Sequence, residues 1–292
     1  MRIQKLNFYQ SDNNSSRLQF LQNDRLSSSG FVKYSKGLSV IILNLDRPEF
    51  IIPLLNQLQD AKEYFLTKSI PLDIQVGDTG STHPDVLKYF REHCKKIHVT
   101  SQLKYHFSRT NNVLFQNTRN SHVLFLNNDI LFSSNVGEQL WGIYNSFCED
   151  SSLGAMGSLL HFENGSIQHA GIDFFRNPEL RGFCYHPNGG KRKTDVMQNF
   201  QISYVPAVTG AFLMMKSDLF HSLGGFSEDY QTECQDVDLC LLIHRLGFKI
   251  GIIHPGKIIH FENGTRKQGE ENWKDRQLFL RRWSSYIEAS FL

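Results

Sequence analysis

The sequence predicts an α/β protein with a Rossmann-like, mostly parallel central sheet flanked by helices and a mixed, less regular C-terminal half. The main observation is that short apolar runs alternate with amphipathic runs of helix length between residue 37 and about residue 130. Parallel strands need long crossover connections, so this alternation favours helices between parallel strands. The second observation is that the alternation is lost after residue 131, which predicts a mixed second half.

Each element of the first half has its own signal. Compact apolar runs predict strands at 38–44, 72–76, 96–100 and 122–126. Apolar residues three or four positions apart predict helices at 49–61, 84–93 and 109–117. In the second half, apolar runs predict strands at 154–162, 166–175 and 207–216. Helices are expected at 217–225, with Ser217 as the N-cap, and from about Gln235 to Leu246, where Gly247 ends the helix.

The chain divides by composition. Residues 1–36 are rich in Ser, Asn and Gln, which suits an extension or linker. The organised domain is expected at 37–266, with a nucleotide-binding-type α/β layer at 37–130 and a less regular half at 131–266. Residues 267–292 are expected to form a C-terminal helical segment.

Composition also narrows the class of protein. The 31 Lys and Arg nearly balance the 29 Asp and Glu, which argues against a dedicated nucleic-acid binder. The five cysteines form no CxxC pair and are odd in number, which favours a reducing compartment. The sequence contains no apolar run of membrane-spanning length and no signal peptide, so a cytoplasmic protein is expected. Peripheral association with the inner face of the cell membrane stays open.

Three acidic residues follow apolar strands. Asp46, Asp78 and Asp129 each come directly after such a run. The carboxyl ends of parallel strands share one edge of a sheet, and ligands bind there, so the three carboxylates are expected to line one cleft. The structural alternative is that Asp is common wherever a strand turns into a loop.

The missing motifs limit how a phosphate could be bound. The first strand is followed by NLDRPE rather than GxGxxG, and no GxxxxGK[ST] loop occurs. A bound diphosphate would then need another positive charge. A divalent cation, Mn²⁺ or Mg²⁺, held by Asp129 supplies one, because oxygen ligands suit these ions.

Three further positions have both a functional and a structural reading. Asp236 and Asp238 start a buried helix, where acids complement the exposed N–H groups, but a carboxylate fixed there could also accept a proton from a hydroxyl. His260 follows another apolar strand and is either a structural residue or a metal ligand beside Asp129. Arg266 lies in a glycine-containing polar stretch, which is either a loop that covers a diphosphate or a solvated charge cluster.

The order and spacing of seven blocks resemble family-2 glycosyltransferases with the GT-A fold, and in particular bacterial sugar transferases of cell-surface polysaccharide assembly. The resemblance covers residues 37 to about 266, and it implies a nucleotide-binding half at 37–130 and an acceptor and catalytic half at 131–266. It is carried by SVIILNLDRPEFI, GDTGST, FSRTNN, VLFLNND, VTGAFLMMKSDLFHSLGGFSEDY, ECQDVDLCLLIHRLG and IIHFENGTR.

The resemblance implies a role for each matching position. It implies that Asp236 is the catalytic base and that Asp129 and His260 bind the metal, with Asn127 in place of the first acid of a DxD-type motif. The residues implied to bind the nucleotide are Asn44, Asp46, Arg47, Asp78, Arg109 and Asn128. The residues implied to line the donor sugar and acceptor are Gly210, Ala211, Asp238 and Arg266. The run RQLFLRRW does not fit the QxxRW motif of processive synthases.

The expected reaction is inverting transfer of a sugar from a UDP- or dTDP-sugar to a hydroxyl of a glycan or lipid-linked glycan acceptor. Two alternatives remain. A nucleotidyltransferase normally has an arginine-rich phosphate loop near the first strand, where this sequence offers only Arg47. A noncatalytic glycan-binding domain could keep the same fold without turnover.

Overall fold

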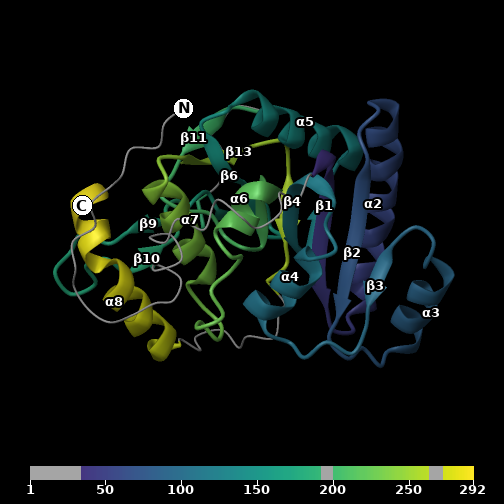
Figure 1. Cartoon of the computed structure of the whole chain (residues 1–292), viewed down its shortest axis with the longest axis horizontal. Helices are drawn as coiled ribbons and strands as arrows, with labels where there is room; N and C mark the ends of the chain where they lie inside the picture. The colour runs from purple at the N-terminus through teal and green to yellow at the C-terminus, as the bar shows by residue number, and fades with distance from the viewer. Residues whose placement is uncertain (1–33, 192–199, 263–271) are drawn as a thin grey trace, which may run out of the picture. The chain divides into compact units, whose positions relative to one another are not determined.

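The structure, a computed structural model, describes residues 34–191, 200–262 and 272–292. Residues 33–292 group as one unit. In the described part of the chain, eight strands form a central sheet in the order β11-β13-β6-β12-β4-β1-β2-β3 (Figure 1). The strands are β1 (Ser35–Asn44), β2 (Leu72–Asp78), β3 (His98–Thr100), β4 (Asn120–Asn127), β6 (Leu153–Ser158), β11 (Ile202–Tyr204), β12 (Phe212–Lys216) and β13 (Lys249–Ile253).

Most of this sheet is parallel, which confirms the predicted architecture. Strand β1 pairs in parallel with β2 and with β4, β2 pairs in parallel with β3, and β13 pairs in parallel with β6. Strand β12 runs antiparallel to both of its neighbours, β4 and β6. The start of β12 therefore lies at the same edge as the carboxyl ends of β1, β2 and β4.

Helices cover both faces of the sheet. Leu124 and Leu126 of β4 join one hydrophobic core, and the intervening Val123 and Phe125 join the other, because successive side chains of a strand point to opposite faces. The first core takes its helical residues from α2 (Pro48–Thr67), α3 (Pro84–Glu92) and α5 (Val136–Glu149). The second takes them from α4 (Phe107–Phe115), α6 (Ser217–Ser222), α7 (Gln235–Arg245) and α8 (Trp273–Ser290).

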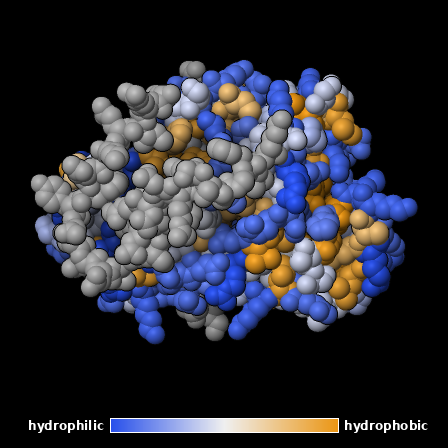
Figure 2. Space-filling view, in the orientation of Figure 1, coloured by the Kyte–Doolittle hydropathy of each residue, from blue (hydrophilic) through white to orange (hydrophobic). Residues whose placement is uncertain are grey.

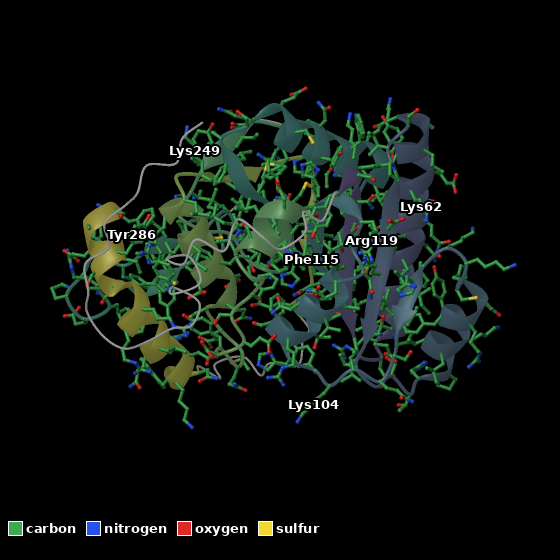
Figure 3. All side chains as sticks on the ribbon, viewed as in Figure 1. Lys62, Lys104, Phe115, Arg119, Lys249 and Tyr286 are labelled. Atoms are coloured by element: carbon green, nitrogen blue, oxygen red, sulfur yellow. The ribbon has the colours of Figure 1, made fainter. Side chains whose placement is uncertain are left out.

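Aromatic rings fill much of the second core. Phe115, labelled in Figure 3, ends α4 and packs against Phe220 of α6 with ring centroids 4.6 Å apart. Phe279 and Trp283 of α8 are buried in the same core. Helix α8 thus packs against α7 as part of the unit that holds the sheet.

Two smaller sheets flank the central one. The first has the order β5-β14-β7-β8 and contains β5 (Ile130–Phe132), β14 (Ile258–His260), β7 (Leu160–His161) and β8 (Ile167–His169). The second pairs β9 (Asp173–Phe174) with β10 (Cys184–Tyr185). Strand β14 runs antiparallel to β5 with His260 opposite Ile130. This pairing brings His260 next to the turn that ends β4.

Several sequence predictions need correction. Ser217 is not the N-cap of α6: Lys216 holds that position, and the buried Ser217 hydroxyl donates instead to the Asn120 carbonyl at 2.7 Å. The strand expected at 207–216 begins only at Phe212, because residues 207–211 form a connection with a turn between Thr209 and Phe212. The runs at 154–162 and 166–175 each divide into two short strands.

The described surface on the face seen in Figure 2 is mostly hydrophilic, with separate hydrophobic areas between the polar ones. Within the described ranges, no helix combines the length and apolar character needed to cross a bilayer.

Candidate functional site

The ends of β1 and β2 form a hydrogen-bonded group at the carboxyl edge of the sheet. Asn44 and Asp78 lie opposite each other in register, and both are almost fully buried. The Ser81 hydroxyl accepts from the Asn44 side-chain amide at 3.2 Å and from the Asp46 backbone N–H at 2.8 Å. The Ser81 N–H donates to Asp78 Oδ1 at 3.1 Å. These bonds hold both strand ends in one fixed arrangement.

Asp46 and Arg47 make a left-handed turn between β1 and α2, with φ of 52° and 58°. Asp46 Oδ1 accepts from the backbone N–H groups of Thr82 at 2.6 Å and His83 at 2.7 Å. The bond from His83, followed by those from Thr82, holds the pKa of Asp46 below its usual range. Asp46 thus ties together the loops that follow β1 and β2. The guanidinium of Arg47 lies 5.3 Å from the centroid of the Phe50 ring.

A second group forms where β4 ends. The Asn128 side-chain amide donates to Asn44 Oδ1 at 2.8 Å, which connects this turn to β1. Asp129 is buried, and its Oδ1 lies 3.3 Å from Nε2 of His260. The same Nε2 lies 3.2 Å from the Asn127 side-chain nitrogen. The structure therefore brings Asp129 and His260 together from positions far apart in the sequence.

Gln168 of β8 sets the tautomer of His260. Its Oε1 lies 2.7 Å from His260 Nδ1, and its Nε2 donates to the carbonyl of His260 and to Glu262 Oε2, each at 3.4 Å. With the amide oriented by these two acceptors, Oε1 accepts a hydrogen bond from the Nδ1–H group of His260. The lone pair of a neutral His260 ring then lies on Nε2, facing Asp129.

A neutral His260 and an ionised Asp129 are two electron-pair donors side by side. An imidazole nitrogen and a carboxylate oxygen are a common ligand set for divalent metals. The described residues contain no group of three or more His, Cys, Asp and Glu side chains placed to hold a metal. Asp129 and His260 would therefore supply two ligands to an ion bound here.

Asp236 lies in the first turn of α7, after Cys234 with φ of 68°. Its Oδ2 accepts from the Gly210 N–H at 2.8 Å, and its Oδ1 accepts from the Val237 N–H at 2.9 Å. The carbonyl of Ala211, the residue after Gly210, accepts from the Asn127 N–H at 3.0 Å. The Gly210-Ala211 step therefore connects Asp236 directly to the end of β4, which carries Asp129.

Arg109 is engaged elsewhere. Its Nε donates to Glu228 Oε2 at 2.9 Å on the exposed side of α4, and the Asn112 side chain donates to the same carboxylate at 3.2 Å. These contacts hold Arg109 against the loop that follows α6. Its predicted role in nucleotide binding therefore has no support from the described contacts.

Asp238 has a structural set of partners. It is buried, and its Oδ1 accepts from the Tyr230 hydroxyl at 2.9 Å and from the Trp283 indole N–H at 2.8 Å. Arg282 lies 3.7 Å from the same oxygen. This carboxylate holds α8 against α7. Arg266, the last of the predicted residues, lies outside the described residues.

Sequence reasoning missed three polar residues, which are Ser81 in the loop after β2 and Gln168 and His169 of β8. The signal for the last two was the pair of polar side chains in SIQHAG, which interrupts an otherwise apolar strand. A polar residue that follows β2 closely, as Ser81 does, was overlooked because serine is common in turns.

The chain is similar to bacterial proteins of surface polysaccharide assembly. It is 25% identical over 243 residues to the O-antigen biosynthesis protein RfbC of Myxococcus xanthus, across 81% of this chain and 18% of RfbC. It is 23% identical over 231 residues to the rhamnosyltransferase WbbL of Escherichia coli K12, across 76% of this chain and 82% of WbbL. The chain thus spans less than a fifth of the length of RfbC. No protein-family profile matches the chain.

Solved structures share the fold. A crystal structure of GalNAc-T7 with UDP, GalNAc and Mn²⁺ superposes with a TM-score of 0.64 at 12% identity, across 86% of this chain and 50% of that one. The mannosyltransferase PcManGT from Pyrobaculum calidifontis, in complex with GDP-Man and Mn²⁺, superposes with a TM-score of 0.55 at 14% identity, across 93% of this chain and 71% of that one. These likenesses confirm the GT-A fold, and with the sequence relatives they confirm the resemblance to bacterial glycosyltransferases of polysaccharide assembly.

Proposed function

We propose that this chain is an inverting glycosyltransferase that moves a sugar from a nucleotide diphosphate sugar to a hydroxyl of a glycan or lipid-linked glycan. One observation carries the proposal. Asp236 and the pair formed by Asp129 and His260 are joined through the short hydrogen-bonded step Gly210-Ala211. The Asp236 carboxylate, which could accept a proton, is thus linked by two hydrogen bonds and one peptide step to the end of β4, where a diphosphate and its cation could bind.

The nucleotide is proposed to bind where β1 and β2 end, beside Asn44 and Asp78. Buried polar groups held in place by Ser81 would read a base or ribose through hydrogen bonds without first rearranging. Asn128, bonded to Asn44, joins this pocket to the proposed metal site. UDP- and dTDP-sugars are the donors that we propose. The inner face of the cell membrane is the proposed location when the acceptor is lipid-linked.

Asp129 and His260 are the residues that would hold Mn²⁺ or Mg²⁺. Such an ion, when bound, supplies positive charge to the departing diphosphate. Gln168 keeps the lone pair of a neutral His260 directed toward Asp129. Asn127 in place of an acid makes the site less negative, so weaker metal binding is expected than with two carboxylates.

Asp236 is proposed to accept the acceptor's proton. In one step, the acceptor oxygen forms a bond to the anomeric carbon, the bond from that carbon to the diphosphate oxygen breaks, and the proton passes to the Asp236 carboxylate. The N–H groups of Gly210 and Val237 each bond to one carboxylate oxygen and fix its orientation. Because attack and departure occur on opposite sides of the carbon, its configuration inverts.

The decisive experiment measures products from a panel of nucleotide sugars with and without Mn²⁺. Release of nucleoside diphosphate supports sugar transfer, whereas pyrophosphate would indicate a nucleotidyltransferase. Glycan binding without any turnover would indicate a noncatalytic domain.

Asp236→Asn tests the base. It should lower the transfer rate by about 10²- to 10⁴-fold while leaving donor affinity largely unchanged. Asp218→Asn is the matched control, because Asp218 also lies in the first turn of a helix and accepts from the N–H of the following residue, Leu219, at 2.7 Å. Transfer at the normal rate by Asp236→Asn would refute the assignment.

A further inference from the structure

A pair of histidines lies beside the proposed base and has no part in the reaction described so far. His169 ends β8 and is almost fully buried, whereas His186 follows β10 and is exposed. Their Nδ1 atoms are 3.0 Å apart, and their rings are inclined at 71°. Two ring nitrogens at this distance share one proton, so one histidine donates and the other accepts.

The backbone decides which histidine donates. The Thr209 N–H points to His169 Nε2 at 3.4 Å, so this nitrogen accepts. Burial holds the pKa of His169 well below its usual range, so the ring is neutral and carries its proton on Nδ1. His169 then donates to Nδ1 of His186. A neutral His186 must therefore carry its own proton on Nε2.

This chain of bonds starts at the segment that holds the base. The Thr209 N–H donates to His169, and the N–H of the next residue, Gly210, donates to Asp236. Although His186 is exposed overall, desolvation by neighbouring protein atoms lowers its pKa, while the carboxylates of Asp236 and Glu262 act in the opposite direction. The bonds from His186 to His169 and from His169 to Thr209 place His186 near the backbone step that holds Asp236, and within the described ranges no hydrogen bond to its Nε2 is seen.

We propose that His186 binds the sugar acceptor, donating from Nε2–H to the oxygen of a hydroxyl next to the one that Asp236 deprotonates. His169 is a positioning residue that fixes the tautomer of His186. The ligand is therefore a sugar with two adjacent hydroxyl groups. This inference rests on the proposed function, since it assumes that Asp236 meets an acceptor hydroxyl.

A purely structural role predicts different behaviour. If the His186 ring only packs against β8, its replacement should lower stability and should change sugar transfer and donor hydrolysis by the same factor. A binding role separates two reactions, because a water molecule that attacks the donor has no neighbouring hydroxyl. Transfer to a sugar should depend on His186, and hydrolysis of the donor should not.

The kinetic test compares wild type with His186→Phe and His186→Gln. Methyl glycosides of glucose, galactose and N-acetylglucosamine serve as acceptors, with the donor that gives the most nucleoside diphosphate. His186→Phe should raise the acceptor KM by about 3- to 10-fold, the range expected for one lost neutral hydrogen bond, and leave hydrolysis unchanged. His186→Gln, which keeps an N–H donor, should restore part of the loss. His122→Phe is the control, since His122 is a half-buried histidine packed edge-on against Tyr144 at the opposite end of β4.

The second measurement needs no turnover. Long-range ¹⁵N–¹H spectra, assigned with His169→Gln and His186→Gln, should show wild-type His169 protonated on Nδ1 and His186 on Nε2. In His169→Phe, His186 should become a mixture of tautomers.

An unchanged acceptor KM in His186→Phe, or an equal loss of hydrolysis, overturns the acceptor role. His186 protonated on Nδ1 overturns the positioning role of His169. If wild type releases no nucleoside diphosphate from any donor, the proposed function itself fails, and this outcome is distinct from the other two.

Discussion

Replacing Gly210 by alanine tests whether the short segment before β12 positions the base. The added Cβ would lie 2.8 Å from Cζ of Phe107 and 3.5 Å from Cβ of Asp236. The first distance is about 0.6 Å shorter than an ordinary 3.4 Å contact. The Phe107 ring packs edge-on against the buried Phe226, with centroids 5.2 Å apart, so it has little room to withdraw. The strain should therefore displace Gly210, whose N–H holds Asp236.

The size of the effect follows from that displacement. A misplacement of 1 Å costs about 10²-fold in rate, so a shift of about 0.6 Å corresponds to roughly a 15-fold loss. Overpacking should also destabilise the fold by about 1 to 3 kcal/mol. Initial rates of nucleoside diphosphate release and urea unfolding measure the two effects separately.

Gly251→Ala separates packing from positioning. The added Cβ would lie 2.9 Å from Leu153 and 3.0 Å from Ile202, so the crowding is similar to that at Gly210. Gly251 lies in β13, and neither of these two neighbours is one of the proposed site residues. We expect Gly251→Ala to lose stability and keep its rate. If Gly210→Ala turns over as fast as Gly251→Ala, the segment does not position the base.

Two further predictions concern stability. Burial lowers the pKa of His122 to about 4 from 6.5, so between these values the unfolded chain binds more protons; the resulting stability is present above pH 6.5 and falls by about 2 kcal/mol at pH 5. Urea unfolding at pH 7 and pH 5 should show a loss about 2 kcal/mol larger in wild type than in His122→Phe, because other buried histidines such as His169 contribute to both proteins; equal losses would contradict it. Asp275 accepts from the backbone N–H groups of Gln231, Thr232 and Glu233 at 2.7 to 3.0 Å, so Asp275→Asn should lower the free energy of unfolding by about 2 to 4 kcal/mol; a change below 1 kcal/mol would show that the loop keeps its bonds in another way.

The strands of the first half could be predicted from sequence because they are buried on both faces. Runs such as 38–44 and 122–126 are almost wholly apolar, and their helices carry a clear apolar stripe. Helix α5 was not predicted. Gly137 lowers its helix propensity and is present because a Cβ there would lie 2.6 Å from Tyr64 of α2. The need for glycine at this position comes from tertiary packing against α2, which cannot be predicted from the local sequence pattern.

The candidate site could be predicted only in part. The rule that strand ends share an edge predicts that Asp46, Asp78 and Asp129 lie along one edge, and the strands that precede them, β1, β2 and β4, are neighbours in the sheet. It does not place Asp236, whose approach depends on the reversed strand β12, or His260, which depends on pairing in a separate sheet. The roles predicted for the individual residues stay predictions.

Local reasoning also could not foresee partners that lie far along the chain. Arg109 forms a hydrogen bond with Glu228, and Asp238 forms one with Trp283. No local sequence motif near these residues predicts either contact. The histidine pair was overlooked for the same reason, since His169 and His186 lie on different strands or loops.

The reversed strand β12 fixes the distance between the proposed base and the proposed metal site. Phe212 lies opposite Leu126 in the ladder between β12 and β4, one residue from Asn127 on one strand and one from Ala211 on the other. Sliding of either strand by one pair would move Asp236 and Asp129 apart by a full residue spacing, about 3.4 Å. The separation between Asp129 and Asp236, the proposed metal ligand and the proposed base, therefore depends on interstrand hydrogen bonds between β4 and β12. Sequence drift in the surrounding loops could alter which sugars enter while leaving that separation untouched.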